Sequence, residues 1–299
     1  MTLPTGTHAQ AVPEQWTVLS LIQWSTAYLE EKGFDEARLH TELLLGHVLG
    51  LERLKLYLQF DRPLTPEELA LFKELFKRRL GHEPLQYILG ETEFMGIRLA
   101  VAPGALIPRP ETELLVEKAV DHIRALNREG VSVLDIGTGS GNIALAVARM
   151  MPASRVTSID VSREALSIAR RNQERLQLQN VILEERDVRE GARTGERYDV
   201  IVSNPPYVSA EDFKNLQPEV RDHEPRLALT DEKNGLSFYP TLFQFAARVL
   251  NADGRLFCEI GYGQAEAVSR MASAEGIQVL DIVSDLAGIP RVLCGAVSS

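Results

Sequence analysis

Apolar side chains recur every three or four residues through residues 17–80, a spacing that is typical of amphipathic helices. The clearest helix is predicted for TPEELALFKELFKRRLG, residues 65–81. Thr65 suits the N-cap, Glu68 completes a capping box, and Gly81 suits the C-terminal cap. One face of this helix carries Leu69, Phe72, Phe76 and Leu80. Similar patterns in the rest of the region predict four or five short helices that pack as a small bundle.

The pattern changes between Glu91 and Ile107, where apolar and polar residues alternate as they do in β-strands. Gly96 and the Pro103-Gly104 pair are turn signals within this stretch. We therefore expect a β-hairpin that connects the helical region to the rest of the chain.

From Val131 onward, short apolar runs alternate with helical patterns. The expected strands are residues 131–137, 155–160, 181–187, 198–203 and 255–261. The expected helices between them include residues 141–151, 162–176 and 264–275. This alternation predicts a parallel sheet with helices on both faces. The last two runs, GIQVLDIVSD and RVLCGAV, have no room for a helix between them, so we expect them to pair antiparallel at one edge.

These patterns together predict an α/β protein with a Rossmann-like sheet and an antiparallel edge hairpin, preceded by a small all-α bundle and a β-hairpin connector. We expect the helical domain to cover residues 1–83, with a disordered lead at residues 1–15. The connector is expected at residues 84–107, and the sheet domain at residues 108–299.

Composition and charge narrow the class of protein. The chain has 299 residues, of which 44% are apolar and 25% charged, as in ordinary globular proteins. The formal net charge of −10 disfavours a protein that binds nucleic acid through a broad basic surface. Cys258 and Cys294 are too few for a disulfide framework, and the histidine spacing suits no zinc site, so we expect no metal. The N-terminus lacks a secretory signal and no apolar run suits a membrane span, so we expect a cytoplasmic protein with no membrane partner.

The first expected strand ends in a glycine-rich turn, LDIGTGSGNIA. Gly137, Gly139 and Gly141 allow the backbone to turn tightly and to approach a ligand closely. The carboxyl ends of parallel strands are where open α/β sheets bind ligands. A glycine-rich turn into a helix is compatible with NAD, FAD or S-adenosylmethionine, so it indicates a nucleotide-like cofactor without choosing among them.

Acidic residues end the next two expected strands. Asp160, at the end of the second, is placed to accept both ribose hydroxyls, although it also suits the N-cap of the helix that begins near Ser162. Asp187, at the end of the third, is placed to accept from an adenine amino group, with Val188 beside the ring. Asp187 also suits the role of a solvated loop acid.

The fourth expected strand is followed directly by Asn204-Pro205-Pro206-Tyr207. An amide or aryl amine nitrogen is a poor nucleophile because its lone pair is delocalised into the π system. The Asn204 side-chain carbonyl and the Pro205 backbone carbonyl are expected to accept from its two N–H groups, with the Pro-Pro turn held rigid. The Tyr207 ring is expected to stack on the planar acceptor. Methyl transfer from S-adenosylmethionine would then depend mainly on positioning.

This four-residue motif resembles that of amino-methyltransferases that act on planar nitrogens of adenine, guanine or glutamine. The stretch from His82 to Glu117, with IPRPETE at residues 107–113, closely resembles the segment that joins the two domains of the HemK/PrmC family, the release factor glutamine N5-methyltransferases. HEPRLALT and RLFCEIGYGQ also resemble family patterns. The resemblance covers roughly residues 17 to 295. The chain departs from the family pattern at residues 230–239, where Asp231, Glu232 and Lys233 interrupt a stretch that is usually rich in glycine.

The resemblance implies methyl transfer to the side-chain amide nitrogen of the glutamine in the GGQ motif of peptide chain release factors, with S-adenosylhomocysteine as the cofactor product. It also implies a set of cofactor contacts: Gly137, Thr138, Gly139, Ser140, Gly141, Asp160, Val188 and Asn204. Asp187 joins this set from its position at the end of the third expected strand. The implied substrate contacts are Asn204, Pro205, Pro206, Tyr207, Phe94, Arg109 and Glu111, of which Asn204, Pro205 and Tyr207 would be catalytic.

Some of these residues also suit a second role, and the motif also suits a different activity. Phe94 fits the core of the hairpin, and Arg109 and Glu111 fit an ion-paired helix start. An adenine-N6 nucleic-acid methyltransferase shares the Asn-Pro-Pro-Tyr chemistry, but the acidic composition argues against direct nucleic-acid binding. A ribosomal-protein glutamine N5-methyltransferase would share the same chemistry, and an inactive module that only binds S-adenosylmethionine would share the same fold.

Overall fold

The computed structural model describes residues 15–298, so all but the last residue of the expected disordered lead lies outside the described part of the chain. Contacts between residues divide the chain into two compact units, with the division after Leu89. The units correspond to the helical region and to the remainder of the chain, and each is described by itself below.

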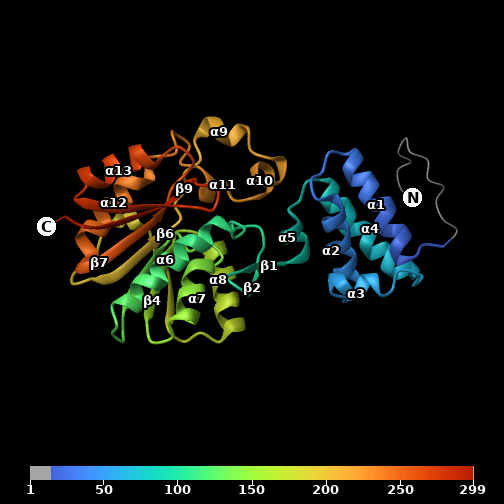
Figure 1. Ribbon diagram of the computed structural model, residues 1–299, viewed down its shortest axis with the longest axis horizontal. Coiled ribbons are helices and arrows are strands. Elements are labelled where there is room, and N and C mark those ends of the chain that lie inside the picture. The colour runs from blue at the N-terminus through green and yellow to red at the C-terminus, as the bar shows by residue number, and fades with distance from the viewer. Residues whose placement is uncertain (1–14, 299) are drawn as a thin grey trace. The chain divides into compact units, whose positions relative to one another are not determined.

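Residues 15–89 of the first unit form five helices (Figure 1). They are α1 (Val18–Glu31), α2 (Ala37–Leu49), α3 (Arg53–Tyr57), α4 (Pro66–Leu80) and α5 (Leu85–Leu89). The predicted capping box of α4 is confirmed, because Thr65 Oγ1 accepts from the Glu68 N–H at 3.2 Å and Glu68 Oε2 accepts from the Thr65 N–H at 2.9 Å. Gly81 occupies the C-cap as predicted, but the left-handed residue is the next one, His82, with φ 60°.

The core of this helical unit explains where it ends. Phe72 and Phe76 of α4 are buried in it, as the apolar face of that helix predicts. Leu85 and Ile88 of α5 are buried in the same cluster. The residues from Pro84 to Leu89, which we expected in the connector, therefore contribute α5 to the helical core.

The second unit begins with the predicted hairpin, β1 (Glu91–Phe94) and β2 (Ile97–Ala100), which pair antiparallel. The described remainder holds a seven-stranded sheet of order β5-β4-β3-β6-β7-β9-β8. Its strands are β3 (Ser132–Ile136), β4 (Arg155–Asp160), β5 (Val181–Glu185), β6 (Tyr198–Ser203), β7 (Leu250–Glu259), β8 (Ile277–Ser284) and β9 (Pro290–Val297). Strands β3 to β7 run parallel, whereas β9 pairs antiparallel with both β7 and β8. The predicted fold class, with its antiparallel edge pair, is confirmed.

Successive residues of each strand point to opposite faces, and each face is covered by helices. Val133 packs with α6 (Glu111–Ala125) and α7 (Asn142–Met150), whereas its neighbour Leu134 packs with α12 (Phe238–Val249) and α13 (Ala265–Ala274). The helix α8 (Arg163–Leu176) lies beside α7 (Figure 1). A strand buried on both sides explains the continuous apolar runs in the sequence.

Two parts of this unit differ from expectation. The strand β7 begins at Leu250 rather than at residue 255, and it runs through the Asn-Ala-Asp-Gly sequence that resembles a turn. Its Gly254 packs so closely that an added Cβ would lie 3.0 Å from the Asp199 carbonyl oxygen.

The other difference concerns short helical segments that the sequence patterns do not indicate. Three of them follow β6: α9 (Ala210–Lys214), α10 (Pro218–His223) and α11 (Arg226–Leu229). The fourth is the 3-10 turn η1 (Val188–Glu190), which follows β5. The helix α10 buries none of its residues, so it leaves no apolar periodicity to detect. No helix within residues 15–298 has the length and apolar character needed to cross a membrane.

Candidate active site

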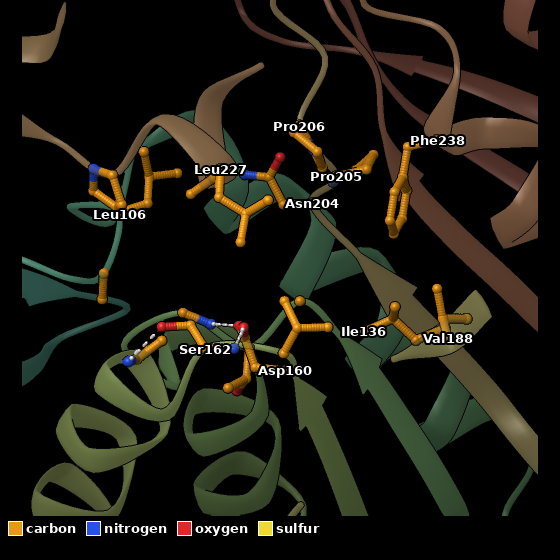
Figure 2. Close-up of a pocket in the computed structure, with 18 of the residues that line it drawn as sticks. Leu106, Ile136, Asp160, Ser162, Val188, Asn204, Pro205, Pro206, Leu227 and Phe238 are labelled. Atoms are coloured by element: carbon orange, nitrogen blue, oxygen red, sulfur yellow. Dashed lines mark hydrogen bonds between the residues drawn. The ribbon is translucent and has the colours of Figure 1, made fainter. Parts of the chain in front are cut away.

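A cavity of about 660 Å³ lies at the carboxyl ends of the parallel strands, a volume typical of small-molecule sites. Ile136 at the end of β3, Asp160 at the end of β4 and Val188 after β5 lie on one side of it (Figure 2). Asn204 after β6, together with Leu227 and Phe238, lies on the opposite side (Figure 2). Open α/β sheets bind ligands at this edge, so the cavity is the candidate site.

The glycine-rich turn forms the floor of the cavity. Gly137, Gly139 and Gly141 have φ angles of 83°, 54° and 85°, which glycine adopts without strain. Gly137, Thr138 and Gly139 line the cavity, and an added Cβ at Gly139 would meet no atom within 4 Å. The last two residues of the turn point into the protein instead of lining the cavity. The Ser140 carbonyl accepts from Asn172 at 2.9 Å, and a Cβ at Gly141 would lie 2.9 Å from Leu145 Cδ1.

Asp160 connects the glycine turn to the helix that follows β4. Its Oδ2 accepts from the Gly139 N–H at 2.9 Å, and its Oδ1 accepts from the Ser162 N–H at 2.9 Å (Figure 2). The N-cap of α8 is Ser162, whose Oγ accepts from the Ala165 N–H at 3.1 Å. The hypothesis that Asp160 caps this helix is therefore wrong. A carboxylate offers about four acceptor positions, so Asp160 retains capacity for a ligand.

Asp187 and Val188 both line the cavity, but their environments differ. The Asp187 carboxylate accepts from the Arg189 N–H and from its Nε, each at 2.9 Å. The Arg189 guanidinium lowers the pKa of Asp187 below its ordinary value. Val188 is buried, with 5% of its surface exposed, in the core beneath the cavity. Asp187 thus serves as the N-cap of η1 at the wall of the cavity.

The Asn-Pro-Pro-Tyr turn is divided between the cavity and the protein interior. Asn204, Pro205 and Pro206 line the cavity, and Asn204 Nδ2 donates to Thr112 Oγ1 at 3.1 Å. The sequence predicts that the Tyr207 ring stacks on the substrate, whereas in the structure this ring is not part of the cavity wall. Its hydroxyl donates instead to Glu259 Oε1 at 3.0 Å, and burial together with that carboxylate raises the pKa of Tyr207 above its ordinary value.

The remaining predicted residues lie at three different depths. Arg109 lines the cavity and forms an ion pair with buried Glu224, whose Oε2 also accepts from the Ile107 N–H at 3.0 Å. Glu111 is exposed at the start of α6 and lies outside the cavity wall. Phe94 has 1% of its surface exposed and belongs to the core on the α6 and α7 face of the sheet, in agreement with the core role that the hairpin pattern also suggested.

Three buried polar residues were not singled out from the sequence: Thr112, which lines the cavity, and Asp135 and Glu259, which lie outside its wall. Thr112 Oγ1 donates to Glu259 Oε2 at 2.7 Å, and burial raises the pKa of Glu259 above its ordinary value. Asp135 lies behind the glycine turn, where Ser158 Oγ donates to its Oδ2 at 2.8 Å. Burial raises the pKa of Asp135 to about 6. The detectable signal was the same for both acids, a carboxylate at the carboxyl end of a buried parallel strand.

Comparison with known proteins assigns the chain to a family. Residues 20–90 match the family model described as PrmC N-terminal domain, and residues 111–220 match the Methyltransferase small domain. The release factor glutamine methyltransferase of Geobacter sulfurreducens is 45% identical over 95% of this chain and 98% of its own length. The chain belongs to the release factor glutamine methyltransferase family. The member from Rhodopirellula baltica is 39% identical over 93% of this chain and 95% of its own.

The chain is also similar in sequence to a protein of solved structure. The release factor-specific protein-(glutamine-N5) methyltransferase from Alicyclobacillus acidocaldarius is 31% identical, with a TM-score of 0.42, over 67% of this chain and all of that one. The identities to the Geobacter sulfurreducens and Rhodopirellula baltica proteins confirm, at the level of the family, the resemblance that the sequence motifs indicated. The chain is a methyltransferase of this family, and its cavity lies at the carboxyl ends of the parallel strands. Within residues 15–298 no group of three His, Cys, Asp or Glu side chains is arranged to hold a metal ion.

Proposed function

We propose that this chain transfers a methyl group from S-adenosylmethionine to the side-chain amide nitrogen of the glutamine in the GGQ motif of peptide chain release factors, and thereby tunes translation termination. The observation that carries this proposal is the hydrogen bonding of the Asn204 side chain. Its Nδ2 is used by Thr112, and in the described part of the chain its Oδ1 accepts no hydrogen bond. The cavity wall therefore contains an acceptor that suits an amide N–H.

The cavity also suits the proposed cofactor. The open space above Gly139 and the remaining acceptor capacity of Asp160 fit the ribose of the cofactor and the amino-acid end of its methionine part. Ile136, Val188 and Phe238 supply apolar surface for an adenine ring. S-adenosylmethionine supplies an electrophilic methyl group on a sulfonium when it is bound. The protein then has to hold the acceptor nitrogen in line with that group and to keep competing water away.

Asn204 and Pro205 are proposed to hold the acceptor. The Asn204 Oδ1 and the Pro205 backbone carbonyl would each accept one N–H of the glutamine amide, and the proline ring limits movement of that carbonyl. This arrangement would direct the nitrogen lone pair towards the methyl group. A general base of matched pKa is not required before attack, because the nitrogen becomes acidic as the new bond forms. The product proton can then leave to solvent.

The helical unit of residues 15–89 is proposed to recognise the release factor outside its GGQ loop. One glutamine side chain offers too few contacts to distinguish a single site among many, so a second binding surface is needed. The family models match these helices separately from the catalytic domain. Because release factors act during translation, we place the reaction in the cytoplasm.

The proposal is tested by measuring methyl transfer from labelled S-adenosylmethionine to a purified release factor, with a ribosomal protein and double-stranded DNA as competing acceptors. Label on the release factor alone supports the proposal. Label on the ribosomal protein or on DNA would instead assign the chain to ribosomal-protein methylation or to adenine methylation. The Asn204→Ala variant should reduce turnover by about two to three orders of magnitude, the usual cost of losing one preorganised polar group.

A further inference from the structure

Both ends of the Asn-Pro-Pro-Tyr turn are joined to one buried carboxylate. Glu259, the last residue of β7, accepts from Thr112 Oγ1 at 2.7 Å and from Tyr207 Oη at 3.0 Å. Thr112, in the first turn of α6, accepts in turn from Asn204 Nδ2 at 3.1 Å. Glu259 has 1% of its surface exposed and lies behind the turn, outside the cavity wall.

The direction of these hydrogen bonds determines how the Asn204 amide is oriented. An ionised carboxylate can only accept, so Glu259 takes the single proton of the Thr112 hydroxyl. Thr112 then has only lone pairs left to offer Asn204. The Asn204 amide must present its NH2 group to Thr112, and its Oδ1 is left for another partner. If Thr112 instead donated to Asn204, the amide would turn over and present its NH2 group where an acceptor is needed.

We propose that Glu259 is a positioning residue for methyl transfer, which fixes the orientation of the Asn204 amide through Thr112 and anchors the other end of the turn through Tyr207. This inference rests on the proposed function, since it concerns the acceptor that holds the substrate amide. It gives Glu259 a role in the reaction although its carboxylate lies outside the cavity wall, and it makes Thr112 the link between that carboxylate and Asn204.

The buried environment of Glu259 lowers folding stability, which is unexpected for a residue with a purely structural role. Burial of a carboxylate is unfavourable, and burial raises the pKa of Glu259. The two hydroxyl donors and the positive charge of Arg291 oppose that effect, whereas the charge of Glu111 adds to it. A glutamine would fill the same space without the cost of burying a charge. What a glutamine lacks is the ability to accept from both hydroxyls at once through separate oxygens, because one of its two polar atoms is a donor.

The test compares Glu259→Gln with the wild-type protein on a release factor and on a short GGQ peptide. Glu259→Gln should lower kcat by about tenfold to a hundredfold, the range expected for a misplaced reacting group. The dissociation constant for S-adenosylmethionine, measured by calorimetry, should stay within about twofold, and KM for the peptide should change less than kcat. Thermal melting should show that the variant is as stable as the wild type or more so. A purely structural role would instead lower the amount of protein that binds the cofactor and leave kcat per binding site unchanged.

Variants of Thr112 test the same link without altering the buried carboxyl. Thr112→Val removes the hydroxyl at nearly constant volume and should lower kcat to a similar extent, whereas Thr112→Ser keeps the hydroxyl and should restore most of the activity. Asp199→Asn is the matched control, because Asp199 is a buried carboxylate at the opposite end of β6, where it accepts from the Ser132 N–H at 2.8 Å. This control should leave kcat unchanged at a temperature where the protein is folded.

The outcomes separate this inference from the proposed function. Absence of transfer by the wild-type protein would overturn the proposed function, and this inference with it. Wild-type transfer with an undiminished kcat in both Glu259→Gln and Thr112→Val would overturn the inference alone. If Glu259→Gln does not fold, Thr112→Val and Thr112→Ser decide the matter, and equal kcat values for these two variants would overturn the inference.

Discussion

The Gly139 N–H donates to Asp160 Oδ2 at 2.9 Å, so the end of β4 holds the glycine-rich turn that follows β3. The other oxygen of the same carboxylate accepts from the Ser162 N–H at the start of α8. Asp160 therefore fixes two stretches of cavity wall while it faces the cavity itself. A substitution of Asp160 removes both its proposed contact with the ribose and its contact with the turn. Each loss should weaken cofactor binding.

We expect Asp160→Ala to weaken S-adenosylmethionine binding at least tenfold, because it removes charge-assisted hydrogen bonds that contribute roughly 1.5–3 kcal/mol each. Titration calorimetry gives the affinity, and circular dichroism verifies that the fold persists. Asp281→Ala, at an exposed carboxylate on the edge strand β8, is the control and should bind normally. An unchanged affinity in Asp160→Ala would remove Asp160 from the cofactor site.

The buried carboxyl of Asp135 makes stability depend on pH. Burial raises its pKa from 3.8 to about 6, so the folded protein favours the protonated form. Its contribution to stability is greatest below pH 4 and declines as the pH rises through about 6. Asparagine does not ionise, so Asp135→Asn should lack this decline. Compared with wild type, the variant should therefore be relatively more stable at pH 8 than at pH 4, and the difference between the two free energies of unfolding should shift in its favour by up to about 3 kcal/mol.

Denaturant unfolding of both proteins at the two pH values measures this difference. Effects of the substitution on packing are the same at both pH values and cancel in the comparison. The same stability difference at pH 4 and at pH 8 would show that Asp135 does not titrate in this range.

Two variants of Tyr207 separate its ring from its hydroxyl. Tyr207→Phe removes only the bond to Glu259 and should lower kcat several-fold, since the link through Thr112 persists. Tyr207→Ala also removes a ring that packs close to Gly261, and we expect about a hundredfold loss of kcat and a loss of about 2–3 kcal/mol of stability. Steady-state kinetics and thermal melting provide both values. If Phe proved as damaging as Ala, the hydroxyl rather than the ring would account for the importance of this position.

Much of the fold could be predicted because its elements leave local signals. The capping box of Thr65 and Glu68, the alternation of the hairpin and the apolar runs of the buried strands are all readable within short windows. The structure also places Asp160 and Asn204 in one cavity, as expected from strands that end at the same edge of a sheet.

The parts that could not be predicted depend on contacts between distant residues. Thr112 and Glu259 are 147 positions apart, and only the fold brings their side chains within 2.7 Å. The direction of the Tyr207 side chain is another such case, since the sequence indicates an aromatic ring but not whether it faces the cavity or the interior. The helix α5 was assigned to the connector because a five-residue helix has too short a pattern to show which core it joins.

We expect a fragment that begins at Gly90 to retain the sheet and to bind S-adenosylmethionine, because the division after Leu89 leaves the second core intact. This fragment should methylate a full release factor about a hundredfold more slowly than the intact chain, which corresponds to about 3 kcal/mol of lost recognition. On a short GGQ peptide it should stay within about tenfold of the intact chain. Initial rates on the two substrates provide the comparison.

Circular dichroism of the fragment must precede these assays, to show that it is folded. A folded fragment that modifies the whole release factor at the intact rate would show that the helical unit is structural. Recognition would then have to reside in the catalytic domain, for example around Arg109 and Leu227 at the cavity.

The identity of the methylated atom is the central claim, and tandem mass spectrometry of the product tests it most directly. A release factor treated with the wild-type protein and S-adenosylmethionine is digested, and the peptide that contains GGQ is fragmented. The account predicts one added methyl group on the side chain of the GGQ glutamine, and an unmodified peptide after treatment with Asn204→Ala for the same short time. A methyl group on any other residue of the release factor, or an unmodified peptide after treatment with the wild-type protein, would contradict it.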